Sequence, residues 1–220
     1  MDAVKPKRSL VEETYNILVD AICTGELASG ERLHQDEIAA RLNVSRQPVN
    51  SAISILRANG LVEDTGRRSV IVTQFDPNLF RGIYEYRRVI EPFAVRLAGR
   101  SLDDRHLRQA NRVLKAGRLA IEGGKLSELL RADALFHEMI YSWSGNQAVE
   151  TSMRTNWHHI RRSMAEVLRD ITDVMPVWAE HNEIVEKLFA GQTEEAAQIM
   201  ENHIEHAYRA IVGSFVVLQK

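Results

Sequence analysis

The sequence has only one cysteine, Cys23, among its 220 residues, so it forms no internal disulfide. We interpret Cys23 as a buried small apolar residue of a helix, and the missing partner suits a reducing cytoplasm. The sequence also has no run of eighteen apolar residues, so we expect no transmembrane helix. The first twenty residues have no apolar stretch followed by a small-residue cleavage site. We therefore expect no secretory signal and a cytoplasmic location.

Acidic residues are missing from one part of the chain. The net charge of −2 argues against a protein that coats nucleic acid non-specifically. Between Ile38 and Val62, however, there is no Asp or Glu, while Arg41, Arg46 and Arg57 all occur there. In a chain with 30 acidic residues, an acid-free run of this length predicts a surface that meets an anion.

The first seventy residues alternate helix and strand signals. Apolar residues of period 3.6 predict a helix that starts after Ser9, and a short helix is predicted over residues 34–42. Ser45 is the expected N-cap of a third helix. Two β-prone segments around residues 64–68 predict a hairpin. This order predicts a winged helix-turn-helix domain over residues 1–76.

A winged helix-turn-helix contacts DNA through the start of its second helix, which enters the major groove. The hairpin tip can reach the minor groove or the phosphate backbone. The candidate DNA-binding residues are Ser45, Arg46, Gln47 and Asn50 at the helix start, and Arg67 and Arg68 at the hairpin tip. The alternative is a solvated helix pair and hairpin with ordinary surface arginines, and the pattern alone leaves both interpretations open.

From residue 77 onward the sequence predicts helices alone, separated by turn and cap residues. The predicted helices span residues 79–99, 103–122, 127–143, 146–170, 174–190 and 193–216. We therefore predict a mainly α fold, in which an all-α bundle of about six helices over residues 77–220 follows the N-terminal domain.

Two polar residues interrupt the apolar helix “ADALFHEMI”. Asp133 and His137 lie four residues apart and so share one helix face, either as a surface pair or as half of a metal site. His181 and His203 occur in similar apolar surroundings in later helices. One carboxylate and three imidazoles make a sound ligand set for a divalent transition metal. Spacing alone does not select them, and the competing imidazoles are His158, His159 and His206.

Arg87 is the candidate for binding a small anion. It lies on the first predicted bundle helix, where an arginine that faces the interior could bind a carboxylate through two parallel hydrogen bonds. The alternative is a surface ion pair with Glu91, one helical turn further along, which would contribute little to stability.

Two parts of the chain together resemble a known family. The stretch “LHQDEIAARLNVSRQPVNSAISILRANGLV” resembles the DNA-binding half of GntR-family transcriptional regulators, with “VSRQPVN”, “AISIL” and “GLV” in register. The bundle resembles the FCD domain of the FadR subfamily in “YRRVIEPFAVRLA”, “DALFHEMIYSWSGN” and “EHNEIVEKLFAGQTEEAAQIMENHI”. Six bundle helices suit the shorter, VanR-like branch.

The resemblance implies a role for particular residues. The family's metal ligands, one Asp and three His, fall on Asp133, His137, His181 and His203. The expected ion is Zn²⁺, with Ni²⁺, Mn²⁺ and Fe²⁺ as alternatives, and it would help to hold a small carboxylate metabolite with Arg87 beside it. The resemblance also implies a homodimer that binds a palindromic double-stranded DNA operator, and not an enzyme.

Two residues depart from the family pattern. Asn50 stands where the family usually has Arg, which predicts an altered operator preference because Asn can contact adenine through two hydrogen bonds. Ser69 stands where the wing commonly has a glycine. Two other functions stay open: a metal-dependent enzyme acting on a small organic acid, and a regulator with a purely structural metal. Against the enzyme, “HEMIY” has Tyr141 in place of the second His of an H-E-x-x-H motif.

Overall fold

The computed structural model describes residues 9–66, 70–168 and 175–218. The chain divides into two compact units, residues 1–75 and 76–220, and the sequence predicts this boundary one residue later. Within the described residues, no helix combines the length and the apolar character that crossing a membrane requires.

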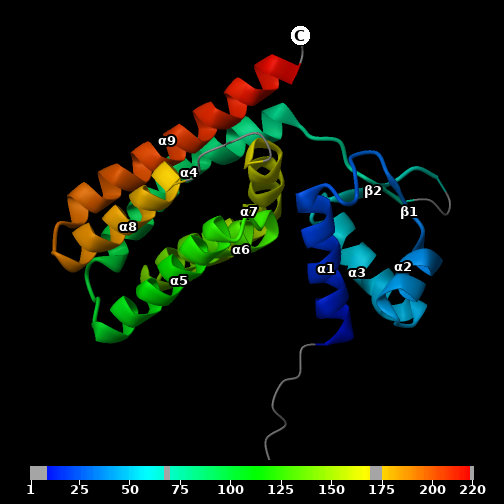
Figure 1. The fold of residues 1–220 in the computed structure, drawn as a ribbon, viewed down its shortest axis with the longest axis horizontal. Helices are drawn as coiled ribbons and strands as arrows, with labels where there is room; N and C mark the ends of the chain where they lie inside the picture. Colours follow the sequence, from blue (N-terminus) through cyan, green and yellow to red (C-terminus); the bar gives the residue numbers. More distant parts are fainter. Residues whose placement is uncertain (1–8, 67–69, 169–174, 219–220) are drawn as a thin grey trace, which may run out of the picture. The chain divides into compact units, whose positions relative to one another are not determined.

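The N-terminal unit consists of helices around a small antiparallel sheet (Figure 1). Its elements are α1 (Leu10–Thr24), β1 (Arg32–Leu33), α2 (Gln35–Leu42), α3 (Arg46–Ala58), β2 (Val62–Asp64) and β3 (Val70–Val72). The strand order is β1-β3-β2, with both pairs antiparallel. Val62 pairs with Val72 and Asp64 with Val70, which confirms the predicted hairpin. The two residues of β1 are too few to show a periodic pattern, and the sequence did not predict this strand.

The helix ends follow from local residue chemistry. The Ser9 side chain accepts a hydrogen bond from the Glu12 backbone N–H at 3.2 Å, and Gly25 ends α1 in the left-handed conformation with φ 75°. Asn43 ends α2 with φ 52°, a conformation that Asn tolerates better than most residues. Ser45 is the N-cap of α3, as predicted. Asn43 and Ser45 are the two ends of the tight turn of the helix-turn-helix.

The core of this unit is apolar. The inner face of α3, including Val49, Ile53 and Leu56, belongs to the same buried cluster as the inner face of α1. Cys23 is fully buried in this cluster, which confirms the interpretation of it as a core residue. Among the described residues of the unit, Thr14 is the one buried polar side chain.

The C-terminal unit is the predicted all-α bundle, with six helices in its described residues. They are α4 (Pro77–Ala98), α5 (Asp104–Glu122), α6 (Leu126–Trp143), α7 (Gln147–Leu168), α8 (Met175–Phe189) and α9 (Thr193–Leu218). Figure 1 shows α4 alongside α9, α5 alongside α6 and α8 alongside α9. The mainly α fold class is therefore confirmed.

A glycine lets α8 pack closely against α5. A Cβ added at Gly117 would lie 1.7 Å from the Trp178 ring, so no other residue fits there without displacing it. The Trp178 indole also donates to the Leu114 carbonyl at 2.9 Å. The Trp178 ring lies 4.7 Å, centroid to centroid, from His181, one turn further along α8. This packing therefore helps to position one of the predicted metal ligands.

Candidate metal centre and DNA-binding surface

The residues predicted to contact DNA form the outer side of the start of α3. The four candidates there are all exposed: Ser45, Arg46, Gln47 and Asn50. Pro48 and Val49 between them are buried, so the helix is anchored through its inner face while polar side chains project outward. The other two candidates, Arg67 and Arg68, lie outside the described residues.

The three arginines of the acid-free run are each paired with a carboxylate from outside that run. The pairs are Arg41 with Glu26, Arg46 Nε with Asp36 Oδ1 at 2.8 Å, and Arg57 Nη2 with Asp64 Oδ1 at 2.9 Å. The run is therefore not an unbalanced positive patch, because tertiary structure brings acids to it from other elements. All three pairs are exposed to solvent and so contribute little to stability. A DNA phosphate can exchange with such carboxylates at small cost.

The four predicted metal ligands come together in the interior of the bundle, from α6, α8 and α9. Nitrogens of His137, His181 and His203 all lie within 4.8 Å of one another, and all three side chains are buried. His181 Nε2 lies 3.2 Å from His203 Nε2. Asp133 places one oxygen 3.6 Å from His181 Nε2 and the other 3.9 Å from His137 Nε2. Zn–N bonds of about 2.1 Å hold two ligand nitrogens within about 4.2 Å, so small movements bring this set onto one ion.

Unpaired polar atoms support this interpretation of the cluster. Among the described residues, Asp133 Oδ2 and His137 Nε2 are buried without a hydrogen-bond partner and lie 3.9 Å apart. His181 Nδ1 is also unpaired, but it is on the side of its ring that faces away from the cluster. Buried polar groups are nearly always satisfied, so two unpaired polar atoms at one place fit the ligand set of an ion. Burial lowers the pKa of both His181 and His203. Both imidazoles are therefore neutral near pH 7, which is the form that binds a metal.

The competing histidines lie outside the cluster. His206 is exposed, while His158 and His159 on α7 are half-buried. The geometry thus separates the three clustered imidazoles from the others, which sequence spacing could not do.

Two carboxylates accept hydrogen bonds from the Nδ1 atoms of clustered imidazoles, a role that the sequence did not predict. Glu91 Oε2 lies 2.6 Å from His137 Nδ1, and Glu180 Oε2 lies 2.9 Å from His203 Nδ1. A carboxylate can only accept, so both Nδ1 atoms carry the proton and both Nε2 lone pairs are free for a metal. Glu180 also accepts from His206 Nδ1 at 2.7 Å. The sequence signal for Glu91 was its position one turn after Arg87.

Arg87 is in the bundle interior, and its pair with Glu91 is buried. Arg87 Nε donates to Glu91 Oε1 at 2.5 Å, and the two side chains are 1% and 0% exposed, so the alternative of a surface ion pair is wrong. Burial raises the pKa of Glu91, but the charge of Arg87 and the hydrogen bonds from Arg87 and His137 outweigh it and hold the pKa well below its ordinary value. Burial lowers the pKa of Arg87, but Glu91 outweighs it and raises the pKa overall. Both groups are ionised.

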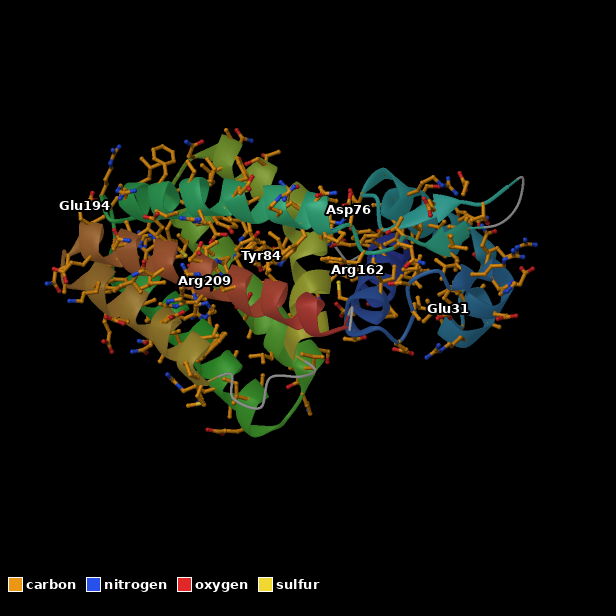
Figure 2. The ribbon with its side chains drawn as sticks, turned by 90° about the horizontal axis from the view of Figure 1, so that it is seen from above. Glu31, Asp76, Tyr84, Arg162, Glu194 and Arg209 are labelled. Carbon is orange, nitrogen blue, oxygen red and sulfur yellow. The ribbon has the colours of Figure 1, made fainter. Side chains whose placement is uncertain are left out.

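Aromatic side chains surround this pair. The guanidinium carbon of Arg87 lies 4.9 Å from the centre of the Tyr84 ring and 5.5 Å from that of Trp157. Figure 2 shows Tyr84 on α4, on the side that faces α9. Burial raises the pKa of Tyr84 to about 12, so its hydroxyl stays protonated. The Tyr84 and Tyr141 hydroxyls and Trp157 Nε1 are buried and form no hydrogen bond within the described residues. The interior therefore offers several hydrogen-bond donors beside the metal ligands.

Comparisons with known proteins agree with both units. The family described as “FCD domain” matches residues 82–206, and that described as “Bacterial regulatory proteins, gntR family” matches residues 10–72. The chain is 26% identical over 197 residues to the uncharacterized HTH-type transcriptional regulator YdhC of Bacillus subtilis, which covers 87% of this chain and 86% of that protein.

Two solved structures share the fold. A putative GntR regulator from Rhodococcus sp. RHA1 superposes with a TM-score of 0.79 at 27% identity and covers 92% of this chain and 97% of that one. E. coli McbR/YncC superposes with a TM-score of 0.84 at 19% identity, with coverage of 95% and 100%. The families and the relative are regulators, in agreement with the prediction that the chain is not an enzyme. The chain belongs to the GntR family of bacterial transcriptional regulators, as a member with an FCD domain at its C-terminal end.

Proposed function

We propose that this regulator senses a small carboxylate through a divalent metal held by Asp133, His137, His181 and His203. The observation that carries the proposal is the buried set of one carboxylate and three imidazoles with unpaired polar atoms. Nitrogen and oxygen ligands of this kind suit Zn²⁺ best, although Ni²⁺, Mn²⁺ and Fe²⁺ accept them too. When bound, the metal supplies a concentrated positive charge that attracts an anion.

The buried charges explain why a metal would be needed for an anionic effector. Arg87 and Glu91 cancel each other, and Asp133 leaves this group of residues with one negative charge. A bound divalent metal would change the net charge of this group from −1 to +1, and a single carboxylate would then neutralise it. Because burying an unbalanced charge is costly, the metal-free interior should reject the acid that the metal-loaded interior accepts. Arg87 then orients the carboxylate, while the hydroxyls of Tyr84 and Tyr141 donate to its other oxygens.

We propose that the regulated activity is binding to an operator through α3. Arg46, Gln47 and Asn50 contact base edges, and Ser45 contacts a phosphate at the helix N-terminus. The effector changes the affinity for DNA by favouring one conformation of the regulator over another.

An exposed apolar stripe on α4 is the surface we assign to a homodimer, which would match a palindromic operator. Leu79, Gly82, Tyr86, Val89 and Phe93 follow one another at spacings of three and four residues, and Val89 is 68% exposed. That spacing places them on one helix face, as in a helix that pairs with a second helix. Size-exclusion chromatography with light scattering tests the assigned dimer surface. Val89→Glu should give monomers, whereas Leu119→Glu, at an exposed apolar residue of α5, should leave the dimer intact.

The test of the sensing function combines metal analysis with binding measurements on the full chain. Purified protein should contain one divalent metal per chain, and Asp133→Ala and His181→Ala should remove it. Small organic acids should raise the melting temperature of the metal-loaded protein and not of the metal-free protein. If metal raises the melting temperature but organic acids raise it no further, the metal is structural.

If Arg46→Ala leaves binding to genomic fragments unchanged at low salt, the assignment of α3 as the DNA-binding helix is wrong.

A further inference from the structure

The position of Glu91 connects two parts of the proposed site. Its two carboxylate oxygens are used separately: Oε1 accepts from Arg87 Nε at 2.5 Å, and Oε2 from His137 Nδ1 at 2.6 Å. Glu91 is 0% exposed, so no water competes for either oxygen. Glu91 and Arg87 come from α4 and His137 from α6, so the contact also joins two helices.

We propose that Glu91 is the positioning residue that links the metal to the anion-binding arginine. One oxygen holds the His137 ring so that Nε2 faces the metal ligands, and the other holds Arg87 in place for the effector. This inference rests on the proposed metal site. It adds that the Glu91 side chain makes metal affinity depend on the position of Arg87, and the position of Arg87 depend on the metal.

The chemistry of a Glu91→Gln substitution shows why this role can be tested. Glutamine has nearly the same shape, but one end of its amide is a donor. Arg87 cannot give up its proton, so the amide oxygen stays with Arg87 and the NH₂ group faces His137. His137 must then accept at Nδ1 and carry its proton on Nε2, which points a hydrogen at the other ligands. The substitution therefore removes a metal ligand without removing the histidine.

Glu180 provides the matched comparison within the same site. It contacts His203 Nδ1 in the same way, but it is 23% exposed and shares its other oxygen with the exposed His206. Water can replace a lost carboxylate contact there. Glu180→Gln should therefore weaken metal binding less than Glu91→Gln. Glu85→Gln, at an exposed position on α4, is the control that should change nothing.

The experiment measures Zn²⁺ affinity of the full-length protein by competition with a chromophoric chelator, together with the absorption spectrum of the Co²⁺-loaded protein. We expect Glu91→Gln to weaken Zn²⁺ binding about 10- to 100-fold, the usual effect of losing such a contact, and to change the Co²⁺ spectrum. Arg87→Lys, which loses the Nε contact with Glu91, should weaken metal binding in the same direction by a smaller factor. A residue that only binds the effector would leave metal affinity unchanged.

A measurement on the unaltered protein covers the case in which Glu91→Gln does not fold. Nitrogen-15 NMR of the histidine rings should show His137 with its proton on Nδ1, both without metal and with Zn²⁺. A proton on Nε2 would overturn the inference, and so would unchanged Zn²⁺ affinity in a folded Glu91→Gln variant; both results leave the metal site standing. If the unaltered protein binds no metal, the proposed sensing function fails, and this inference fails with it.

Discussion

The two units of the chain use their charged residues in opposite ways. In the N-terminal unit, Thr14 is the one buried polar side chain among the described residues, and Arg41, Arg46 and Arg57 form exposed ion pairs. In the bundle, charged and titratable side chains occupy the interior itself: Arg87, Glu91, Asp133, His137, Arg162, His181 and His203. The contrast between exposed and buried charges decides which kind of group each unit is suited to bind. Exposed pairs are easily exchanged for DNA phosphates, whereas a buried charged cluster is stable only when its members are paired with each other or with an ion.

The largest difference should appear when an ion pair is broken in each unit. Glu91→Ala leaves Arg87 buried and unpaired, and we expect a loss of about 3–5 kcal/mol in the free energy of unfolding. Asp36→Ala breaks the exposed pair with Arg46 and should leave unfolding nearly unchanged. Urea denaturation followed by far-ultraviolet circular dichroism measures both units, and tryptophan fluorescence identifies the bundle transition, because all three tryptophans, Trp143, Trp157 and Trp178, lie in the bundle. Equal losses in both variants would contradict the comparison.

Metal should stabilise the bundle and leave the N-terminal unit unchanged. Zn²⁺ at 100 times its dissociation constant should add about 2.7 kcal/mol to the free energy of unfolding. Hydrogen exchange should show the added protection in α6, α8 and α9, and none in α1, α2 and α3. His181→Ala should abolish the effect, and His206→Ala, at an exposed position of α9, should retain most of it. Protection spread over both units would show that the metal does not act at this cluster.

On the N-terminal side, the corresponding test uses DNA. Arg46→Ala should weaken operator binding by about 1–3 kcal/mol without changing the stability of the bundle. Asp36→Asn removes the carboxylate that competes with phosphate for Arg46, so it should strengthen binding, most clearly at low salt. Fluorescence anisotropy over a salt series measures both effects. A weaker complex with Asp36→Asn would mean that the carboxylate positions Arg46 for DNA.

Protonation of His158 in acid should destabilise the bundle by a smaller amount. Burial, followed by the charges of Arg161 and His159, lowers the pKa of His158 to about 4. Its folded pKa lies below the ordinary value of about 6.5, so the stability it contributes is present above pH 6.5 and is lost as pH falls toward 4. We expect about 1 kcal/mol from this imidazole by pH 5.5. His158→Gln should reduce the slope of stability against pH, measured by urea denaturation of metal-free protein.

Much of the fold could be predicted because its signals are local. Where the structure describes them, the ends of the bundle helices lie within two residues of the predicted ends, since residues such as Asp103 and the glycines at the turns mark those ends in the sequence. The predicted helix residues 169, 170 and 174 lie outside the described residues. The sequence did not predict β1, because a strand of two residues is too short to show an alternating pattern. The sequence also did not predict the pair of Arg46 with Asp36. An acid-free run shows which residues follow one another in the chain, but not which acids lie beside them in the fold.

By itself, the sequence determined the fold class, because periodicity and caps are properties of consecutive residues, while the family and the candidate ligands followed from its resemblance to known motifs. Only the tertiary structure decided which histidines meet, that Arg87 is buried, and that Glu91 lies between Arg87 and His137. Those contacts join residues that are up to 66 positions apart in the chain. Helix packing alone brings such residues together, and burial then leaves their polar atoms few partners other than one another.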